Sequence, residues 1–239
     1  MNRPAGSLSL GELSRAAARK PTIILLWATV AIVTWRYFGS PRFFLAHLAP
    51  PGVAGSASPD AELYSWGAAL VLFGLVPLLL IRFAFAETMA SYGLTVGDWR
   101  LGLKALLALS PLMVALAAVA SRNPEFLAQY PLWRGACASP PAFFVHVAAY
   151  LAYYIGFETL FRGFVQFGLR ESLGDWNAIL VQTALSTTMH LGKPTGEIYG
   201  AVLGGIVFGV LAFRTRSLLA VTLLHWVLGV ALDLFICLG

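Results

Sequence analysis

The stretch GFETLFRGFVQFGLR, residues 156–170, places a glutamate and an arginine four residues apart inside a strongly apolar part of the chain. On a helix this spacing puts both side chains on one face, one turn apart, so Arg162 is expected to contact Glu158. An ionisable side chain in the bilayer core costs about 2.5–3.5 kcal/mol on insertion scales. Both groups must therefore face a partner or water, and this stretch is a candidate functional site.

The composition identifies the chain as an integral membrane protein. Of its 239 residues, 59% are hydrophobic and only 11% are charged, and the mean hydropathy is +0.77. A helix needs about 20 apolar residues to cross a bilayer. Runs of this kind lie at 21–38, 61–86, 101–120, 140–168, 176–191, 197–213 and 217–236. The fold class expected is all-α, a polytopic membrane protein with about seven transmembrane helices.

The distribution of Lys and Arg predicts the topology. Residues 1–20 form a basic cytoplasmic segment, and residues 21–239 form a single transmembrane domain whose first helix is a retained anchor. Several flanking basic residues are expected on the same side: Arg82, Arg100, Lys104, Arg170, Arg214 and Arg216. We expect the inner membrane of a bacterium, with the N-terminus in the cytoplasm. The net charge of +5 follows from this topology, and no basic cluster indicates a nucleic-acid partner.

Two cysteines, Cys137 and Cys237, are expected near the outer face. An oxidising compartment there would permit a disulfide. Because the sequence alone cannot show that the two cysteines meet, we favour the interpretation that they are unrelated free thiols. Residues 39–60 and 121–139 are interpreted as outer loops.

The sixth apolar run contains glycines at four-residue spacing, which allows close helix packing in lipid. They are Gly200, Gly204, Gly205 and Gly209. Their expected role is structural.

Polar residues repeat at four-residue spacing in three of the predicted helices. The three stripes are Tyr154, Glu158, Arg162, Gln166 and Arg170; Gln182, Ser186 and His190; and His225, Gly229 and Asp233. From the cytoplasmic helix ends, Glu158, His190 and His225 lie about 18, 21 and 14 Å deep at 1.5 Å per residue. These three titratable groups can therefore converge near the middle of the membrane.

A carboxylate and two imidazoles in a cavity that admits water can hydrolyse a peptide bond. The same set, Glu158, His190 and His225, could instead hold one divalent metal such as zinc, with water in the open position. A network of satisfied hydrogen bonds or a proton path is the non-catalytic alternative. His146 lies on another face and is assigned to packing, and Lys193, Pro194 and Glu197 are interpreted as a turn, with a lid or substrate contact as the alternative.

Three segments, FETLFRG at 157–163, STTMH at 186–190 and LLHWVLG at 223–229, resemble the signature segments of the CPBP intramembrane endopeptidases. This family includes CAAX prenyl endopeptidases and bacteriocin-processing and self-immunity proteins. The resemblance covers about residues 90–236. It implies an active site inside the bilayer and a membrane-associated protein or peptide as the substrate.

The resemblance also assigns residues by position. Glu158 and Arg162 match the second glutamate and the arginine of E-E-x-x-x-R, while His190 and His225 match the histidines of the second and third segments. In the family the first glutamate is the one credited with activating water. For this chain we expect Glu158 to activate water with His190, His225 to stabilise the oxyanion or bind a metal, and Arg162 to position Glu158.

Two positions depart from the family pattern. Phe157 stands where the family has its first glutamate, and Gly229 stands where an asparagine is common. The sequence therefore leaves two alternatives to a peptidase: a non-catalytic scaffold or immunity protein, and a proton-coupled transporter.

Overall fold

A computed structural model describes residues 20–50 and 59–239, and within these ranges every regular element is a helix. The expected cytoplasmic segment, residues 1–20, lies almost wholly outside the described residues. The helices are, in chain order, α2 (Lys20–Phe38), α3 (Pro41–His47), α4 (Pro59–Ala69), η2 (Leu70–Leu75), α5 (Val76–Leu79), η3 (Leu80–Ala84), η4 (Met89–Tyr92), α6 (Trp99–Ala120), α7 (Pro124–Gln129), η5 (Arg134–Ala138), α8 (Pro140–Glu158), η6 (Thr159–Phe167), α9 (Gly168–Thr188), α10 (Thr195–Thr215) and α11 (Leu219–Leu238).

Six continuous helical segments in the described ranges are long and apolar enough to cross a membrane. The longest, Pro140–Thr188, has 49 residues, about twice the length that one crossing needs. Its helix is interrupted at Gly174, where φ is 75° and ψ is 165°, and α9 then packs back along η6. The expectation of an all-α membrane protein with about seven spans is therefore confirmed.

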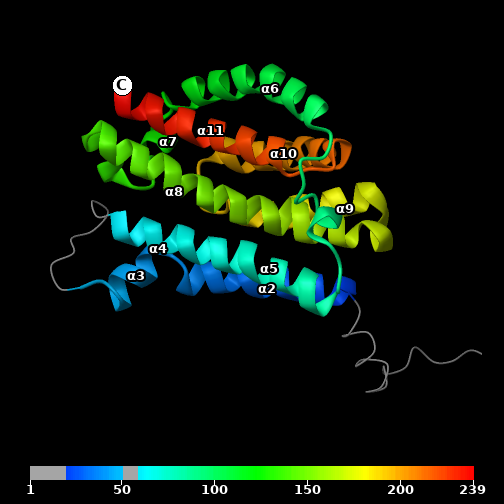
Figure 1. Cartoon of the computed structure of the whole chain (residues 1–239). Coiled ribbons are helices and arrows are strands. Elements are labelled where there is room, and N and C mark those ends of the chain that lie inside the picture. The colour runs from blue at the N-terminus through cyan, green and yellow to red at the C-terminus, as the bar shows by residue number, and fades with distance from the viewer. Residues whose placement is uncertain (1–19, 51–58) are drawn as a thin grey trace, which may run out of the picture.

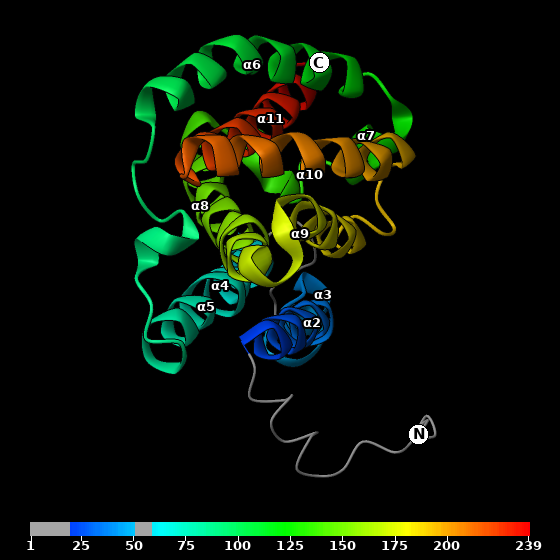
Figure 2. The same cartoon turned by 90° about the vertical axis from the view of Figure 1, so that its right-hand side faces the viewer.

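Residues 156–170 lie at the centre of the bundle. Figures 1 and 2 show α8 between α4 and α2 on one side and α10 and α11 on the other, while α6 arches over α10 and α11. In η6, the residues from Thr159 to Gln166 are all buried. The polar stripe on this helix thus faces other helices rather than lipid.

Two of the four glycines in α10 form the expected close contact. Gln166 Nε2 donates to the Gly209 carbonyl at 2.8 Å, and Gln182 Nε2 donates to the Gly205 carbonyl at 2.8 Å. A Cβ at either glycine would overlap a neighbouring side chain, whereas a Cβ at Gly200 or Gly204 would meet no heavy atom within 4 Å. The other two glycines therefore do not serve the packing that their spacing predicted.

The interpretation of the cysteines as unrelated thiols is wrong, because Cys137 and Cys237 form a disulfide. The bond joins η5 to the last turn of α11, so it closes a sequence separation of 100 residues. We call this end of the bundle the outer end. The two expected outer loops are also partly helical: α3 lies in the first, and α7 and η5 lie in the second.

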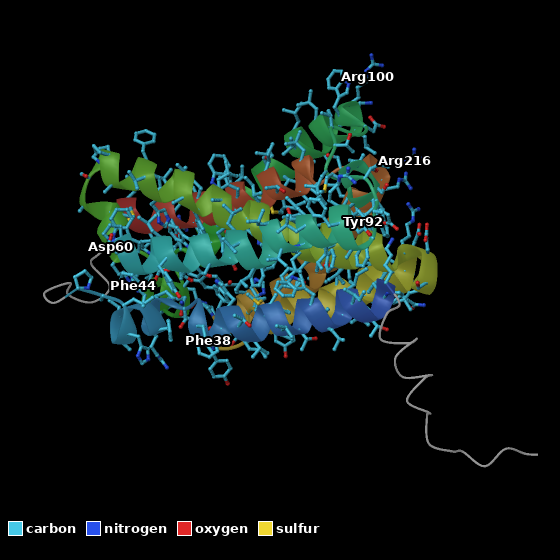
Figure 3. The ribbon with its side chains drawn as sticks, turned by 60° about the horizontal axis from the view of Figure 1, so that its bottom comes forward. Phe38, Phe44, Asp60, Tyr92, Arg100 and Arg216 are labelled. Atoms are coloured by element: carbon cyan, nitrogen blue, oxygen red, sulfur yellow. A yellow bond between two sulfur atoms is a disulfide. The ribbon has the colours of Figure 1, made fainter. Side chains whose placement is uncertain are left out.

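The opposite end of the bundle gathers basic side chains. Lys20, Arg170 and Arg216 border one hollow there, together with Glu87 and Tyr92. Figure 3 shows Arg100, Arg216 and Tyr92 at this end and Phe44 and Asp60 at the other. We call it the basic end, and it groups Arg100, Arg170 and Arg216 as the topology argument expected.

Candidate active site

Glu158 lies at the junction of α8 and η6, with its side chain fully buried. Arg162 Nη1 donates to Glu158 Oε1 at 3.2 Å, which confirms the contact expected from the four-residue spacing. The arginine is almost as buried as the glutamate. Each charge therefore has an opposite charge beside it, as burial at this depth requires.

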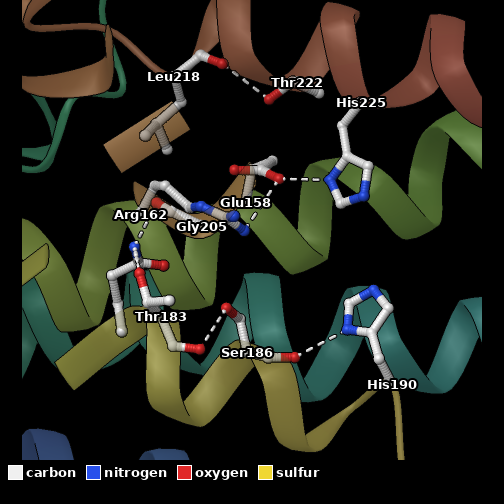
Figure 4. Close-up of polar contacts among 10 residues, drawn as sticks. Glu158, Arg162, Thr183, Ser186, His190, Gly205, Leu218, Thr222 and His225 are labelled. Atoms are coloured by element: carbon white, nitrogen blue, oxygen red, sulfur yellow. Dashed lines mark hydrogen bonds and ion pairs between the residues drawn. The ribbon is translucent and has the colours of Figure 1, made fainter. Parts of the chain in front are cut away.

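His225 comes from α11 and completes this buried group (Figure 4). Its Nδ1 is 2.7 Å from Glu158 Oε1, the oxygen that Arg162 also contacts. Since a carboxylate bonded by Arg162 can only accept, the His225 Nδ1–H is the donor. The Glu158 carboxylate thus keeps a hydrogen on His225 Nδ1 and fixes the orientation of the ring.

His190 lies in the turn after α9, because that helix ends at Thr188 instead of continuing to residue 191 as the sequence suggested. Its Nδ1 is 3.0 Å from the Ser186 carbonyl, which accepts the Nδ1–H and leaves Nε2 as an acceptor. The pKa of His190 is lowered to about 4, mainly by burial and also by the charges of Lys193 and His225, against the opposing effect of Glu197. At neutral pH the ring is therefore uncharged.

Phe157 separates His190 from the Glu158 group. Its buried ring makes an edge contact with both imidazoles, at centroid distances of 6.2 Å to His190 and 5.3 Å to His225. The Arg162 guanidinium lies 5.5 Å from the same ring. Three of the four expected site residues, His190, His225 and Arg162, therefore lie against one ring, at the position where the resemblance implies a glutamate.

Tyr154 explains the glycine at position 229. A Cβ on Gly229 would overlap the Tyr154 hydroxyl, and the Tyr154 ring lies 4.5 Å from the His225 ring. The tyrosine thus occupies the space that an asparagine at position 229 would need.

The side-chain arrangement does not fit the metal site that the sequence left open. Among the described residues, no three His, Cys, Asp or Glu side chains are grouped closely enough to hold a metal ion. Arg162 and His225 both contact Glu158 Oε1, and Phe157 lies between the two imidazoles. Zinc would require its nitrogen and oxygen ligands at about 2.0–2.2 Å, so we derive no step through a metal.

Lys193 and Glu197, which the sequence assigned to a turn or a lid, form a second polar group beside His190, a contact that sequence reasoning missed. Glu197 in α10 accepts from the Tyr130 hydroxyl at 2.7 and 2.8 Å and from Lys193 Nζ at 3.0 Å. Its Oε1 lies 3.8 Å from His190 Nε2. The Lys193–Glu197 spacing was the only signal in the sequence, because Tyr130 is 67 residues away from Glu197.

His146 does not join either group, as expected. It is fully buried and its Nε2 is 2.7 Å from Asp233 Oδ2, between α8 and α11. This pair ties together the two helices near the outer end.

Residues 138–231 match the family model described as type II CAAX prenyl endopeptidase Rce1-like. Over this segment the chain is similar to that family. The match includes Glu158, Arg162, His190 and His225, and it confirms the resemblance to the CPBP intramembrane proteases. No curated protein and no solved structure matches the chain.

Proposed function

We propose that this protein is an intramembrane endopeptidase that hydrolyses a peptide bond in a membrane-associated protein or peptide. The observation that carries the proposal is the contact between buried Glu158 and His225, with Arg162 bonded to the same carboxylate, inside the segment that matches an endopeptidase family. Maintaining charges at this depth is costly, and a packing role alone would be served better by apolar side chains.

The burial of Glu158 supports a role different from direct water activation. Its side chain is fully buried, whereas the side chains of His190 and His225 are 13% and 17% exposed. We assign proton transfer to His190, whose Nε2 is an acceptor. Glu158 then acts through His225: it stabilises the protonated ring, whose Nε2–H can donate to the developing oxyanion. Arg162 holds Glu158 in place.

The substrate class follows from the setting and the family. The matching family is named for prenylated CAAX C-termini, so peptides of that type and other membrane-proximal segments are the substrates to test first. We place the N-terminus and the basic end in the cytoplasm of a bacterial inner membrane, because basic flanks favour that side. The outer end, with its disulfide, then faces an oxidising compartment.

The proposed function is tested with the full chain reconstituted in lipid vesicles. A panel of prenylated C-terminal peptides and transmembrane peptides is incubated with the wild type, Glu158→Gln and His190→Ala, and the products are identified by mass spectrometry. We expect both variants to lose about 10²–10⁴ in kcat/KM. Glu171→Gln, at the exposed basic end, is the control for loss of a negative charge.

A non-catalytic scaffold is the second candidate, and Phe157 is the observation that favours it. Where the family pattern has a glutamate, this chain has an apolar ring in contact with both imidazoles. If the wild type cleaves no member of the panel, and Glu158→Gln complements a deletion strain as well as the wild type, the scaffold is the better account.

A further inference from the structure

Glu197, in the first turn of α10, has its carboxylate beside His190 Nε2, the ring nitrogen that carries no hydrogen. Glu197 Oε1 lies 3.8 Å from His190 Nε2, and the two side chains are 18% and 13% exposed. A distance of 3.8 Å is too long for a direct hydrogen bond. It does allow one water molecule to lie within hydrogen-bond distance of both atoms.

Glu197 is held in place by groups from two other parts of the chain. The Tyr130 hydroxyl donates to both of its oxygens, and Lys193 Nζ donates to Oε1 and to the Tyr130 hydroxyl. Nearby, Glu125 of α7 accepts a hydrogen bond from the Thr195 N–H at the start of α10. The outer segment from α7 to Tyr130 therefore fixes the start of α10, and with it the direction of the Glu197 carboxylate.

We propose that Glu197 and His190 together bind and activate the attacking water, and that Glu197 replaces the carboxylate missing at Phe157. This inference rests on the proposed endopeptidase function. The water donates one hydrogen to His190 Nε2 and the other to Glu197 Oε1. The side chains of both acceptors are partly exposed, whereas Glu158 is fully buried.

The charges on the two side chains suit this reaction. His190 is neutral at rest and its Nδ1–H is bonded to the Ser186 carbonyl, so Nε2 can take the proton from water. The proton turns the ring into an imidazolium, which the neighbouring Glu197 carboxylate stabilises. Because Lys193 donates to Glu197 Oε1 and the Tyr130 hydroxyl contacts both carboxylate oxygens, the carboxylate keeps one orientation while it binds the water.

The complete step conserves atoms and charge. One O–H bond of water breaks as its proton moves to His190 Nε2, and the oxygen forms a bond to the scissile carbonyl carbon. The π electrons move to the carbonyl oxygen, which His225 stabilises. When the tetrahedral intermediate collapses, the C–N bond breaks and the leaving nitrogen takes the proton from His190. The products are a carboxylic acid and an amine, with no oxidant or reductant required.

The decisive experiment compares Glu197→Gln with Glu125→Gln in the reconstituted full chain. Both substitutions remove one negative charge from the same docked region, but only Glu197 reaches His190. We expect Glu197→Gln to lower kcat/KM by about 10²–10³ while the folded protein keeps its thermal stability. Glutamine at position 125 still has a side-chain oxygen that can accept from the Thr195 N–H, so Glu125→Gln keeps the contact between α7 and α10. Its activity should therefore stay within about threefold of the wild type, well under 1.4 kcal/mol in transition-state free energy.

The pH profile separates catalysis from a structural role. Three charged or titratable groups face His190: Lys193 in the same turn, Glu197 on α10 and His225 on α11. Of these, Glu197 raises the pKa of His190, so its removal lowers that pKa further. Since activity is lost as pH falls through this pKa, the acid limb of the residual activity should move to lower pH in Glu197→Gln.

Three results would overturn the inference. In the first, Glu197→Gln retains activity within about threefold of the wild type while His190→Ala is inactive; the endopeptidase would then stand and only the role of Glu197 would fall. Equal losses in Glu197→Gln and Glu125→Gln, or an unmoved acid limb, would show that Glu197 only docks the outer segment. If the wild type cleaves nothing, the proposed function fails first, and this inference fails with it.

Discussion

Phe157 is the residue at which the candidate site departs most from the family pattern that the chain resembles. Because it lies against His190, His225 and Arg162, a carboxylate placed there would reach the groups that a catalytic water needs. Arg162 would also offset the added negative charge, although it already pairs with Glu158. The site thus has two places for a carboxylate next to His190, and this chain fills only the one on α10.

This geometry predicts a rescue. In a Glu197→Gln background, Phe157→Glu should recover about tenfold or more in kcat/KM, because it restores a negative charge beside His190. Phe157→Gln in the same background is the control, since it has the same shape without the charge. The measurement is peptide cleavage by the reconstituted proteins. Equal recovery by the glutamine variant would mean that space, not charge, limits the reaction.

A second prediction concerns the steric contact between Gly229 and Tyr154. Gly229→Ala should lower the free energy of unfolding by about 1–3 kcal/mol, because its Cβ would overlap the Tyr154 hydroxyl. In a Tyr154→Phe background the same change should cost less, since the overlapping oxygen is gone. Thermal unfolding of the four proteins in one detergent measures the coupling. Additive effects would contradict the steric explanation.

At the scale of helices, the contact between α10 and the η6–α9 pair rests on two glycines and two glutamines. Gly209→Ala should destabilise the fold by about 1–3 kcal/mol, since a Cβ there would lie 2.8 Å from Gln166 Oε1 and 3.1 Å from Gln182 Nε2. Gly204→Ala is the matched control, because its Cβ would meet no heavy atom within 4 Å. Thermal unfolding in detergent compares the two. A loss of stability in Gly204→Ala as large as in Gly209→Ala would refute the packing assignment.

The helices also show what the sequence could and could not predict. Long apolar runs and four-residue polar spacing are local signals, so the membrane fold and the Glu158–Arg162 contact were predictable. The end of α9 at Thr188 was not, since nothing in its hydropathy separates His190 from the helix. The contact between Glu197 and His190 was missed for a related reason: Glu197 reaches His190 only because the chain turns between α9 and α10.

At the scale of the whole molecule, the disulfide and the basic residues lie at opposite ends of the bundle. Cys137–Cys237 joins η5 to the end of α11, while Lys20, Arg170 and Arg216 surround the hollow at the basic end. The two ends of the bundle therefore differ in chemistry along the direction in which the helices cross the membrane: one carries the disulfide and the other carries the basic hollow. The turn that carries His190 lies near α7, since Glu125 of α7 accepts a hydrogen bond from Thr195 at the start of α10.

The orientation and the disulfide can be tested together in intact cells. The reduced chain gains the freedom of a loop of 100 residues in its unfolded state, so Cys137→Ser should lower stability by about 2–4 kcal/mol. In the wild type, a membrane-impermeant maleimide should label both cysteines only after an impermeant reductant is added, because both lie at the outer end. Labelling of Cys137 or Cys237 without reductant would contradict the disulfide.

The matched control for the orientation is a cysteine introduced at the basic end. Exposed Ser91 borders the hollow there, so Ser91→Cys is made in a chain with both native cysteines changed to serine. Because the basic end is placed in the cytoplasm, the introduced thiol should react with the impermeant maleimide only after the cells are opened. Reaction of that thiol in intact cells would reverse the orientation, and the turn that carries His190 would then lie toward the cytoplasmic side of the membrane.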